Sequence, residues 1–360
     1  MSFSHIVWQE KDQLQPMAHH AVVHGMLDTW KRCTLLGMTP EEPDFVAGLV
    51  LVTAPVLYDA LRAVFRQHRI RVSLASVFCH QTPHVTFPGM TNGSCELGDL
   101  LIVHVHATPA GAVTRNALLY QAKRTSQQPY AIPSSEEDQL RLYTEWPTFE
   151  YVRSGPLTGQ QRRVCPGLPH LGAQYLLIDD RPPSDSRSGL AGAPNTYPVG
   201  SCMADQYLHD HADLASELLA FLLLRSGRPF LDRSHLEMDG WSEIVWDLLA
   251  TSLRKALTRK RSGRASAPRY AGAPLHVLDS CSFAQATNQE AQQTVTHLLG
   301  PSGSRLLYSA PGDPPPSDDW PGDELPGPGG GVAVILVETA ETRNEEEPAR
   351  GWRDPRRARG

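Results

Sequence analysis

Two short aliphatic runs, separated by a loop, constrain the fold of this chain more than any other feature. The first run, residues 99–103, opens with an acid, and the second, residues 117–123, ends in a Gln-x-Lys pattern. Each run is rich in aliphatic residues and predicts a buried strand. Side chains alternate between the faces of a strand, so Gln121 and Lys123 share one face. If the two strands pair, Asp99 meets both side chains at the rim of the sheet.

The first of these strands also predicts which side chains lie away from that rim. Asp99 shares its face with Leu101 and Val103, whereas His104 and His106 fall on the opposite face. This alternation argues against a single metal cluster made of both histidines and Asp99. We interpret the two histidines as part of a half-buried strand end.

The flanking segments predict an α/β fold. A helix is expected over 56–68, a strand over 72–79, a helix over 134–146 and a strand over 172–179. With the two aliphatic runs, the order becomes helix, three strands, helix, strand.

This order and the Asp-x(n)-Gln-x-Lys pattern resemble the restriction-endonuclease-like superfamily, whose motif is written PD-(D/E)xK. The match is to the variant with Gln in place of the third acid, and it covers about residues 56–180. The resemblance implies a restriction-endonuclease-like core. It also implies a metal-dependent DNA endonuclease, for example a restriction or anti-phage defence effector, that hydrolyses phosphodiester bonds.

The candidate site residues have the chemistry that such a reaction needs. Asp99 is the expected main metal ligand, and Gln121 adds a neutral amide oxygen beside the backbone carbonyl of Ala122. Mg²⁺ accepts one or two carboxylates with water and substrate phosphate, and Mn²⁺ is the alternative ion. Lys123 is expected to orient the attacking water or to neutralise charge developing on the phosphate. Glu96 supplies a second acidic ligand only if the chain bends at residues 97–98.

Two further residues are accessory candidates. Asp59 lies on the predicted first helix of the core, where an acid joins the metal site in some relatives. His80 follows the first predicted strand and could carry protons or contact phosphate, as could His84. A solvated helix face and a polar turn are the competing interpretations of these positions.

The length of the chain, 360 residues, is sufficient for two domains. Pro-, Gly- and Ser-rich segments set the predicted boundaries. We expect an N-terminal helical extension at 1–55, a nuclease-like core at 56–180, a linker at 181–198, a mainly helical C-terminal domain at 199–343 with a disordered insert at 311–331, and a mobile tail at 344–360.

The net charge of −6 means that a DNA partner would need a local basic patch. Residues 248–278 hold seven basic residues and no acid. Such a segment could follow a phosphate backbone, although cations at a helix C-terminus are also favoured by the helix dipole. The predicted nucleic-acid contacts are Arg254, Lys255, Arg259, Lys260, Arg261 and Arg264. A protein partner or a second copy of the chain is a further expectation.

The six cysteines are scattered without a CxxC pair, which favours a reducing, cytoplasmic setting over a zinc ribbon. The chain does not open with the pattern of a signal peptide. The most apolar stretch, residues 45–56, is too short to span a membrane and predicts a buried helix. We therefore expect a cytoplasmic protein without a membrane partner.

Two alternatives to a nuclease remain open at this stage. Replacing the third acid by Gln removes a negative charge, so the fold could be an inactive scaffold or a nucleic-acid-binding protein. The third hypothesis is a hydrolase that uses His80 or His84 and does not depend on Asp99.

Overall fold

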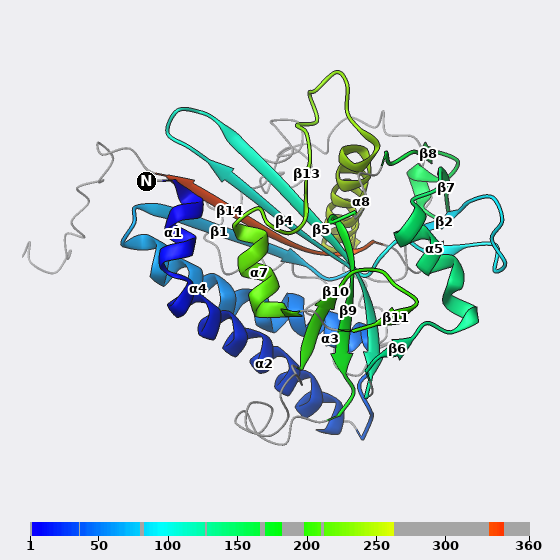
Figure 1. The fold of residues 1–360 in the computed structure, drawn as a ribbon, viewed down its shortest axis with the longest axis horizontal. Helices are drawn as coiled ribbons and strands as arrows, with labels where there is room; N and C mark the ends of the chain where they lie inside the picture. Colours follow the sequence, from blue (N-terminus) through cyan, green and yellow to red (C-terminus); the bar gives the residue numbers. More distant parts are fainter. Residues whose placement is uncertain are drawn as a thin grey trace, which may run out of the picture.

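The computed structural model describes residues 2–35, 37–79, 83–126, 128–165, 170–181, 198–209, 212–262 and 331–341. Within these residues the chain forms an α/β fold around one eight-stranded mixed sheet. The predicted α/β class is confirmed in this general form. Helices cover both faces of the sheet (Figure 1).

The large sheet contains the strands predicted from the two aliphatic runs at its centre. Its strands in spatial order are β1 (Ile70–Val77), β14 (Ala333–Glu341), β4 (Leu100–Ala107), β5 (Val113–Thr125), β9 (Ala173–Asp179), β10 (Val199–Cys202) and β12 (Ala212–Asp213), while β13 (Arg228–Pro229) pairs with β5. Strands β4 and β5 are antiparallel, whereas β14 runs parallel to β4 and β9 runs parallel to β5.

Two smaller sheets lie beside the large one. The first has the order β3 (Cys95–Glu96), β2 (His84–Thr86), β7 (Phe149–Val152) and β8 (Gln161–Arg162). The second pairs β6 (Tyr130–Ala131) with β11 (Tyr207–Leu208). Strand β3 therefore belongs to a different sheet from β4, although only residues 97–99 separate them.

The two faces of the large sheet are covered by different helices, as Figure 1 shows. One face packs against α1 (Phe3–Gln9), α2 (Lys11–Leu35), α3 (Glu42–Gly48), α4 (Ala54–Arg66) and α7 (Leu214–Leu222). The other face packs against α5 (Glu137–Glu145), α8 (Gly240–Ser262) and the four-stranded sheet. The alternation predicted for β4 is observed, because Leu101 and Val103 contact the second group and Ile102 contacts the first.

Helices α3 and α4 are joined by a π-helical turn, Leu49–Thr53, so the chain stays helical through Pro55. Proline is tolerated there because it stands in the first turn of α4. The resulting run, Glu42–Arg66, is 25 residues long and by length and composition alone could cross a membrane. The helix is thus longer than the apolar stretch of residues 45–56 on which the sequence prediction depended. However, 72% of its most apolar window is buried inside the protein, as the predicted core helix requires.

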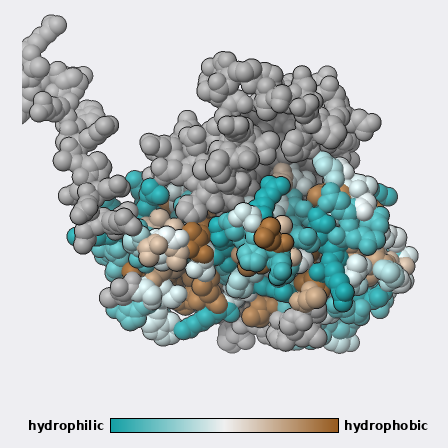
Figure 2. All heavy atoms as spheres, turned by 90° about the horizontal axis from the view of Figure 1, so that it is seen from above, coloured by the Kyte–Doolittle hydropathy of each residue, from teal (hydrophilic) through white to brown (hydrophobic). Residues whose placement is uncertain are grey.

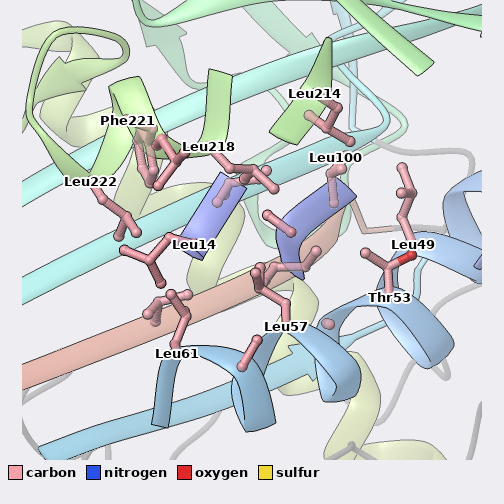
Figure 3. Close-up of a pocket in the computed structure, with 17 residues that line it drawn as sticks. Leu14, Leu49, Thr53, Leu57, Leu61, Leu100, Leu214, Leu218, Phe221 and Leu222 are labelled. Carbon is pink, nitrogen blue, oxygen red and sulfur yellow. The ribbon is translucent and has the colours of Figure 1, made fainter. Parts of the chain in front are cut away.

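The core between α2, α4, α7 and the sheet contains an apolar cavity of about 30 Å³ (Figure 3). Leu14, Leu57 and Leu61 from the helices and Leu100 from the sheet line it. It lies on the face of the sheet opposite to Leu101 and Val103. Apolar cavities of this size tend to remain dry, so we regard it as a packing defect and not as a binding site.

Strand β14 comes from the far end of the described chain and completes the large sheet. It stands between β1 and β4, so the first and second predicted strands are not neighbours. Strands β10, β12 and β14 all belong to the large sheet, and the described part of 199–343 is therefore not a separate layer. In this mainly helical part, helix α7 begins only at Leu214, because β11 and β12 precede it. The predicted insert at 311–331, apart from Gly331, and most of the linker at 181–198 lie outside the described residues, as does the tail at 344–360.

Figure 2 shows one face of the molecule, on which apolar side chains lie in small groups between polar ones. In the described part of the chain, the large apolar side chains with substantial exposure are Trp8, Leu35, Met38, Leu171, Tyr207, Leu224, Leu231 and Leu236. Single exposed apolar side chains are ordinary on protein surfaces and need no partner to explain them.

Candidate functional site

The predicted trio comes together where β4 begins and β5 approaches its end. Asp99 lies in the bend before β4, and its N–H donates to the carbonyl of Tyr120 at 2.8 Å. Continuing the register of Leu100 with Tyr120 places Asp99 opposite Gln121. The side chains of Asp99, Gln121 and Lys123 are all buried. The alternation along β5 puts Gln121 and Lys123 on the face covered by α5 and α8.

Asp99 is held by both a side chain and the backbone of β5. Its Oδ2 accepts hydrogen bonds from Gln121 Nε2 and, at 2.8 Å, from the N–H of Ala122. Burial raises the pKa of the Asp99 carboxyl well above its ordinary value, and the charge of Glu96 raises it further. The Ala122 N–H opposes this effect without cancelling it. Asp99 is therefore an acid that needs positive charge to be stable in its ionised form.

Glu96 reaches the same place because the chain turns between β3 and β4. Gln139 Nε2 donates to the carbonyl of Glu96 at 3.2 Å, and Tyr143 Oη donates to the carbonyl of Leu97 at 2.9 Å. A Cβ atom on Gly98 would lie 2.7 Å from Leu119 Cδ1 and 2.9 Å from Tyr143 Oη, so this turn has room only for glycine. The bend on which a ligand role for Glu96 depended is thus present.

The Glu96 carboxyl is electrostatically part of this group. Burial raises its pKa, Lys123 lowers it and a hydrogen bond with Asp99 also lowers it, with a net increase. Two neighbouring carboxyls with raised pKa values indicate a position where a proton or a cation is favoured.

Lys123 is the cation of the site. Its Nζ lies 2.9 Å from Glu136 Oε2. Burial by itself would lower the pKa of the Lys123 ammonium, but Glu42 and Glu136 outweigh it and the pKa is raised. Lys123 is therefore protonated at neutral pH and acts as a donor and a positive charge, not as a base.

Glu42, at the start of α3, is a member of the site that the sequence analysis missed. Its Oε1 accepts from the N–H of Arg124 at 3.0 Å, directly after Lys123 on β5. Burial raises the pKa of Glu42, and the charge of Lys123 partly offsets this. The available signal was the acidic segment of residues 41–44, which directly precedes the apolar stretch predicted to be a buried helix.

The other predicted residues do not join this group in the described structure. Asp59 is exposed on α4. His80 lies outside the described residues. Arg254, Lys255, Arg259, Lys260 and Arg261 belong to α8, but their side chains lie outside the described part, as does the whole of Arg264.

The histidines near the site occupy two different environments. His84 Nε2 lies 3.9 Å from Glu96 Oε1, and its Nδ1 lies 3.4 Å from Ser94 Oγ. These separations are longer than those of well-formed hydrogen bonds between a nucleophile, a base and an acid. As predicted, His104 and His106 face away from Asp99 and both contact Thr339 Oγ1 at 2.9 Å.

The candidate donors near Asp99 are of the kind that a hard divalent cation accepts. The donors are the Asp99 and Glu96 carboxylates, the Gln121 amide oxygen and the Ala122 carbonyl, all of them oxygen atoms. Gln121 Oε1 is buried and accepts no hydrogen bond from any described residue. Among the described residues, no three Asp, Glu, His or Cys side chains could hold a metal ion as they stand. The coordination shell of a cation bound here would therefore have to be completed by the amide oxygen, a backbone carbonyl and water.

Comparison of the chain with protein-family models, with curated proteins and with solved structures found no match. The assignment of a function to this site therefore depends on its own residues and geometry.

Proposed function

We propose that this chain is a metal-dependent nuclease of the restriction-endonuclease-like type, with Gln121 in place of the third acid. The observation that carries the proposal is the meeting of Asp99, Gln121 and Lys123 across β4 and β5, with Gln121 Oε1 buried and unpaired among the described residues. An amide oxygen without a donor is costly unless a cation or water satisfies it.

The arrangement of elements also supports this proposal. Leaving aside the short strands of the two smaller sheets, helix α4 is followed along the chain by β1, β4, β5, α5 and β9, in the order that the resemblance implies. Strand β14 departs from the simplest version of this core, because it enters the sheet between β1 and β4. The departure leaves the β4, β5 and β9 part, on which the proposed site depends, continuous.

Each side chain has a defined role in the proposed reaction. Asp99 and Glu96 would hold Mg²⁺ or Mn²⁺ through carboxylate oxygens, and Gln121 would do so by turning its amide oxygen toward Asp99. The bound ion would act as a Lewis acid on a phosphate oxygen. Lys123 would donate hydrogen bonds to the attacking water or to the phosphate, because its ammonium remains charged. Glu42 would balance the charge of Lys123 from the side of α3.

DNA is the polymer that we propose as substrate. The segment that supports this choice is the run of basic residues from Arg254 to Arg264, at and beyond the end of α8. Its cations would contact the phosphate backbone without reading the bases.

The direct test is cleavage of supercoiled plasmid by purified protein with Mg²⁺ and, separately, with Mn²⁺. We expect cleavage by the wild type and a loss of at least about a hundredfold in Asp99→Asn and in Lys123→Ala. Asp59→Asn is the matched control, because it removes an acid of the same type from the exposed face of α4. Calorimetric titration with Mg²⁺ should show binding that Asp99→Asn abolishes and Asp59→Asn retains.

The outcomes separate the three hypotheses. Metal binding without cleavage would support an inactive scaffold of the same fold. Cleavage that is unaffected by Asp99→Asn but lost in His84→Ala would support the histidine-dependent hydrolase and contradict the proposed site.

A further inference from the structure

Lys123, to which the proposed function assigns the substrate phosphate, is paired with Glu136 in this structure. Lys123 Nζ and Glu136 Oε2 are 2.9 Å apart, and the Lys123 side chain is only 7% exposed whereas that of Glu136 is 30% exposed. Glu136 is therefore the more solvent-exposed member of the pair. A phosphate group that approaches Lys123 from solvent is therefore repelled by this carboxylate.

Glu136 and Lys123 form a charge-assisted contact. The Glu136 carboxylate raises the pKa of Lys123 both through its charge and through a hydrogen bond, and its Oε2 is a buried atom. The ammonium of lysine has three donors and forms a compact charge, so it can exchange one oxygen anion for another. A carboxylate and a phosphate oxygen present similar acceptors to it.

The segment that carries Glu136 is attached separately from the large sheet. Glu136 lies in a 3₁₀ turn, Ser134–Glu136, between β6 and α5. The side chain of Asn92 donates to the carbonyl of Ser135 at 3.0 Å, and the N–H of Ile132 donates to the carbonyl of Gln206 at 3.0 Å. These contacts hold the turn through backbone atoms, so the Glu136 side chain can change its rotamer without breaking them.

We propose that the Glu136 carboxylate occupies, on Lys123, the place of a phosphate oxygen of a nucleic-acid strand, and that the strand binds only after Glu136 has left this position. This inference rests on the proposed nuclease function, because it assigns Lys123 the role of contacting the substrate phosphate. Two anions cannot share the ammonium at low cost, since unit charges a few ångströms apart repel strongly near a protein surface. Glu136 thus restricts access to the site and selects for ligands with enough phosphate charge to displace it.

The test measures binding, so it does not depend on catalysis. The probe is a fluorescein-labelled oligothymidylate of 12 nucleotides, titrated by anisotropy in EDTA and, separately, with Ca²⁺ in place of Mg²⁺. We expect Glu136→Gln to raise affinity about tenfold, because it removes the competing charge and keeps the shape of the side chain. Glu137→Gln is the matched control, since it removes an exposed neighbouring acid, and it should change affinity less than about twofold. The double variant Lys123→Ala with Glu136→Gln should lose the gain.

Several results would overturn the inference. Equal affinities of Glu136→Gln and Glu137→Gln would show a general charge effect. A weaker affinity in Glu136→Gln, or no gain in either buffer, would mean that Glu136 supports Lys123 instead of competing with the substrate. A gain in affinity that persists in the double variant would show that the strand does not bind through Lys123. Glu136→Ala provides a second variant if Glu136→Gln unfolds, and the same tenfold gain is expected of it.

Inorganic phosphate, used as a competitor of the labelled strand, tests the ligand class. Displacement of the strand from Glu136→Gln only at phosphate concentrations far above those of unlabelled oligothymidylate supports a polymer ligand. Equal competition by free phosphate would overturn the nucleic-acid part of the inference. If the affinity gain appears but the wild type cleaves no plasmid with Mg²⁺ or Mn²⁺, the proposed nuclease activity fails while the anion site stands.

Discussion

Replacing Gln121 by glutamate tests whether this rim of the sheet is built for a cation. Gln121 Nε2 donates to Asp99 Oδ2, and both side chains are buried. Glutamate has nearly the same shape as glutamine, but it replaces this donor with a second carboxylate. Two buried carboxylates in contact cannot both ionise unless a cation lies between them. Gln121→Glu should therefore destabilise the metal-free protein and increase its dependence on metal.

The cost of this substitution has an upper limit, because the introduced carboxyl can always take up a proton. Keeping a proton at pH 7 on a glutamate with an ordinary pKa of about 4.3 costs about 3.7 kcal/mol, at about 1.36 kcal/mol for each pH unit. At pH 5.5 the same limit is about 1.6 kcal/mol. We therefore expect the loss in the free energy of unfolding, measured in EDTA, to shrink by roughly half between pH 7 and pH 5.5.

Urea unfolding followed by tryptophan fluorescence measures this quantity, since Trp241 is fully buried. Adding Mg²⁺ at about a hundred times its Kd should restore about 2.7 kcal/mol through binding to the native state. Gln174→Glu is the matched control. Gln174 is also buried and donates to an acid, Glu217, at 3.0 Å, but it is the partner of Tyr120, on the opposite face of the sheet.

We expect Gln174→Glu to be destabilised by a similar amount and not to be rescued by Mg²⁺. Equal rescue of both variants would show a non-specific effect of the ion. No rescue of Gln121→Glu would refute the reasoning that a divalent cation belongs between residues 99 and 121.

Three further predictions concern the fold and the turn before the site. The pKa of His104 is lowered from 6.5 to about 3, first by burial and then by His106, so the unfolded chain binds more protons between these values. The stability that this histidine supports is complete above pH 6.5 and is lost as pH falls toward 3, by about 2 kcal/mol at pH 5. His104→Leu should lack this share of the pH dependence, and urea unfolding curves with parallel pH slopes in both proteins would contradict the prediction. Gly98→Ala should lower the free energy of unfolding by about 1–3 kcal/mol through the clash with Leu119. It should also weaken Mg²⁺ binding in calorimetry, since Asp99 follows directly. An unchanged Mg²⁺ affinity would contradict the role given to this turn. Leu61→Ala, beside the apolar cavity, should cost about 2–5 kcal/mol in urea unfolding. Because Leu61 lies on the other face of the sheet, the Mg²⁺ affinity of this variant should equal that of the wild type. A reduced affinity would show that loss of stability alone weakens Mg²⁺ binding.

The sequence by itself determined the local features of this protein. Alternation along residues 99–106 and 117–123 predicted two buried strands and the face on which each side chain lies. It therefore placed Gln121 and Lys123 together and turned His104 away from them. These features depend on contacts between residues close in the chain, which periodicity records directly.

Only the tertiary structure decided which distant segments complete the sheet and the site. Strand β14 pairs with β4 although Thr339 and His104, which contact each other, are 235 residues apart. Its run of apolar residues predicts a strand but does not indicate which other strand it pairs with. Likewise, Glu42 is an ordinary first-turn acid in the sequence and becomes part of the site only because α3 packs beside β5. The physical reason is that strand and helix partners are chosen by the burial of whole faces, and no short stretch of sequence records that choice.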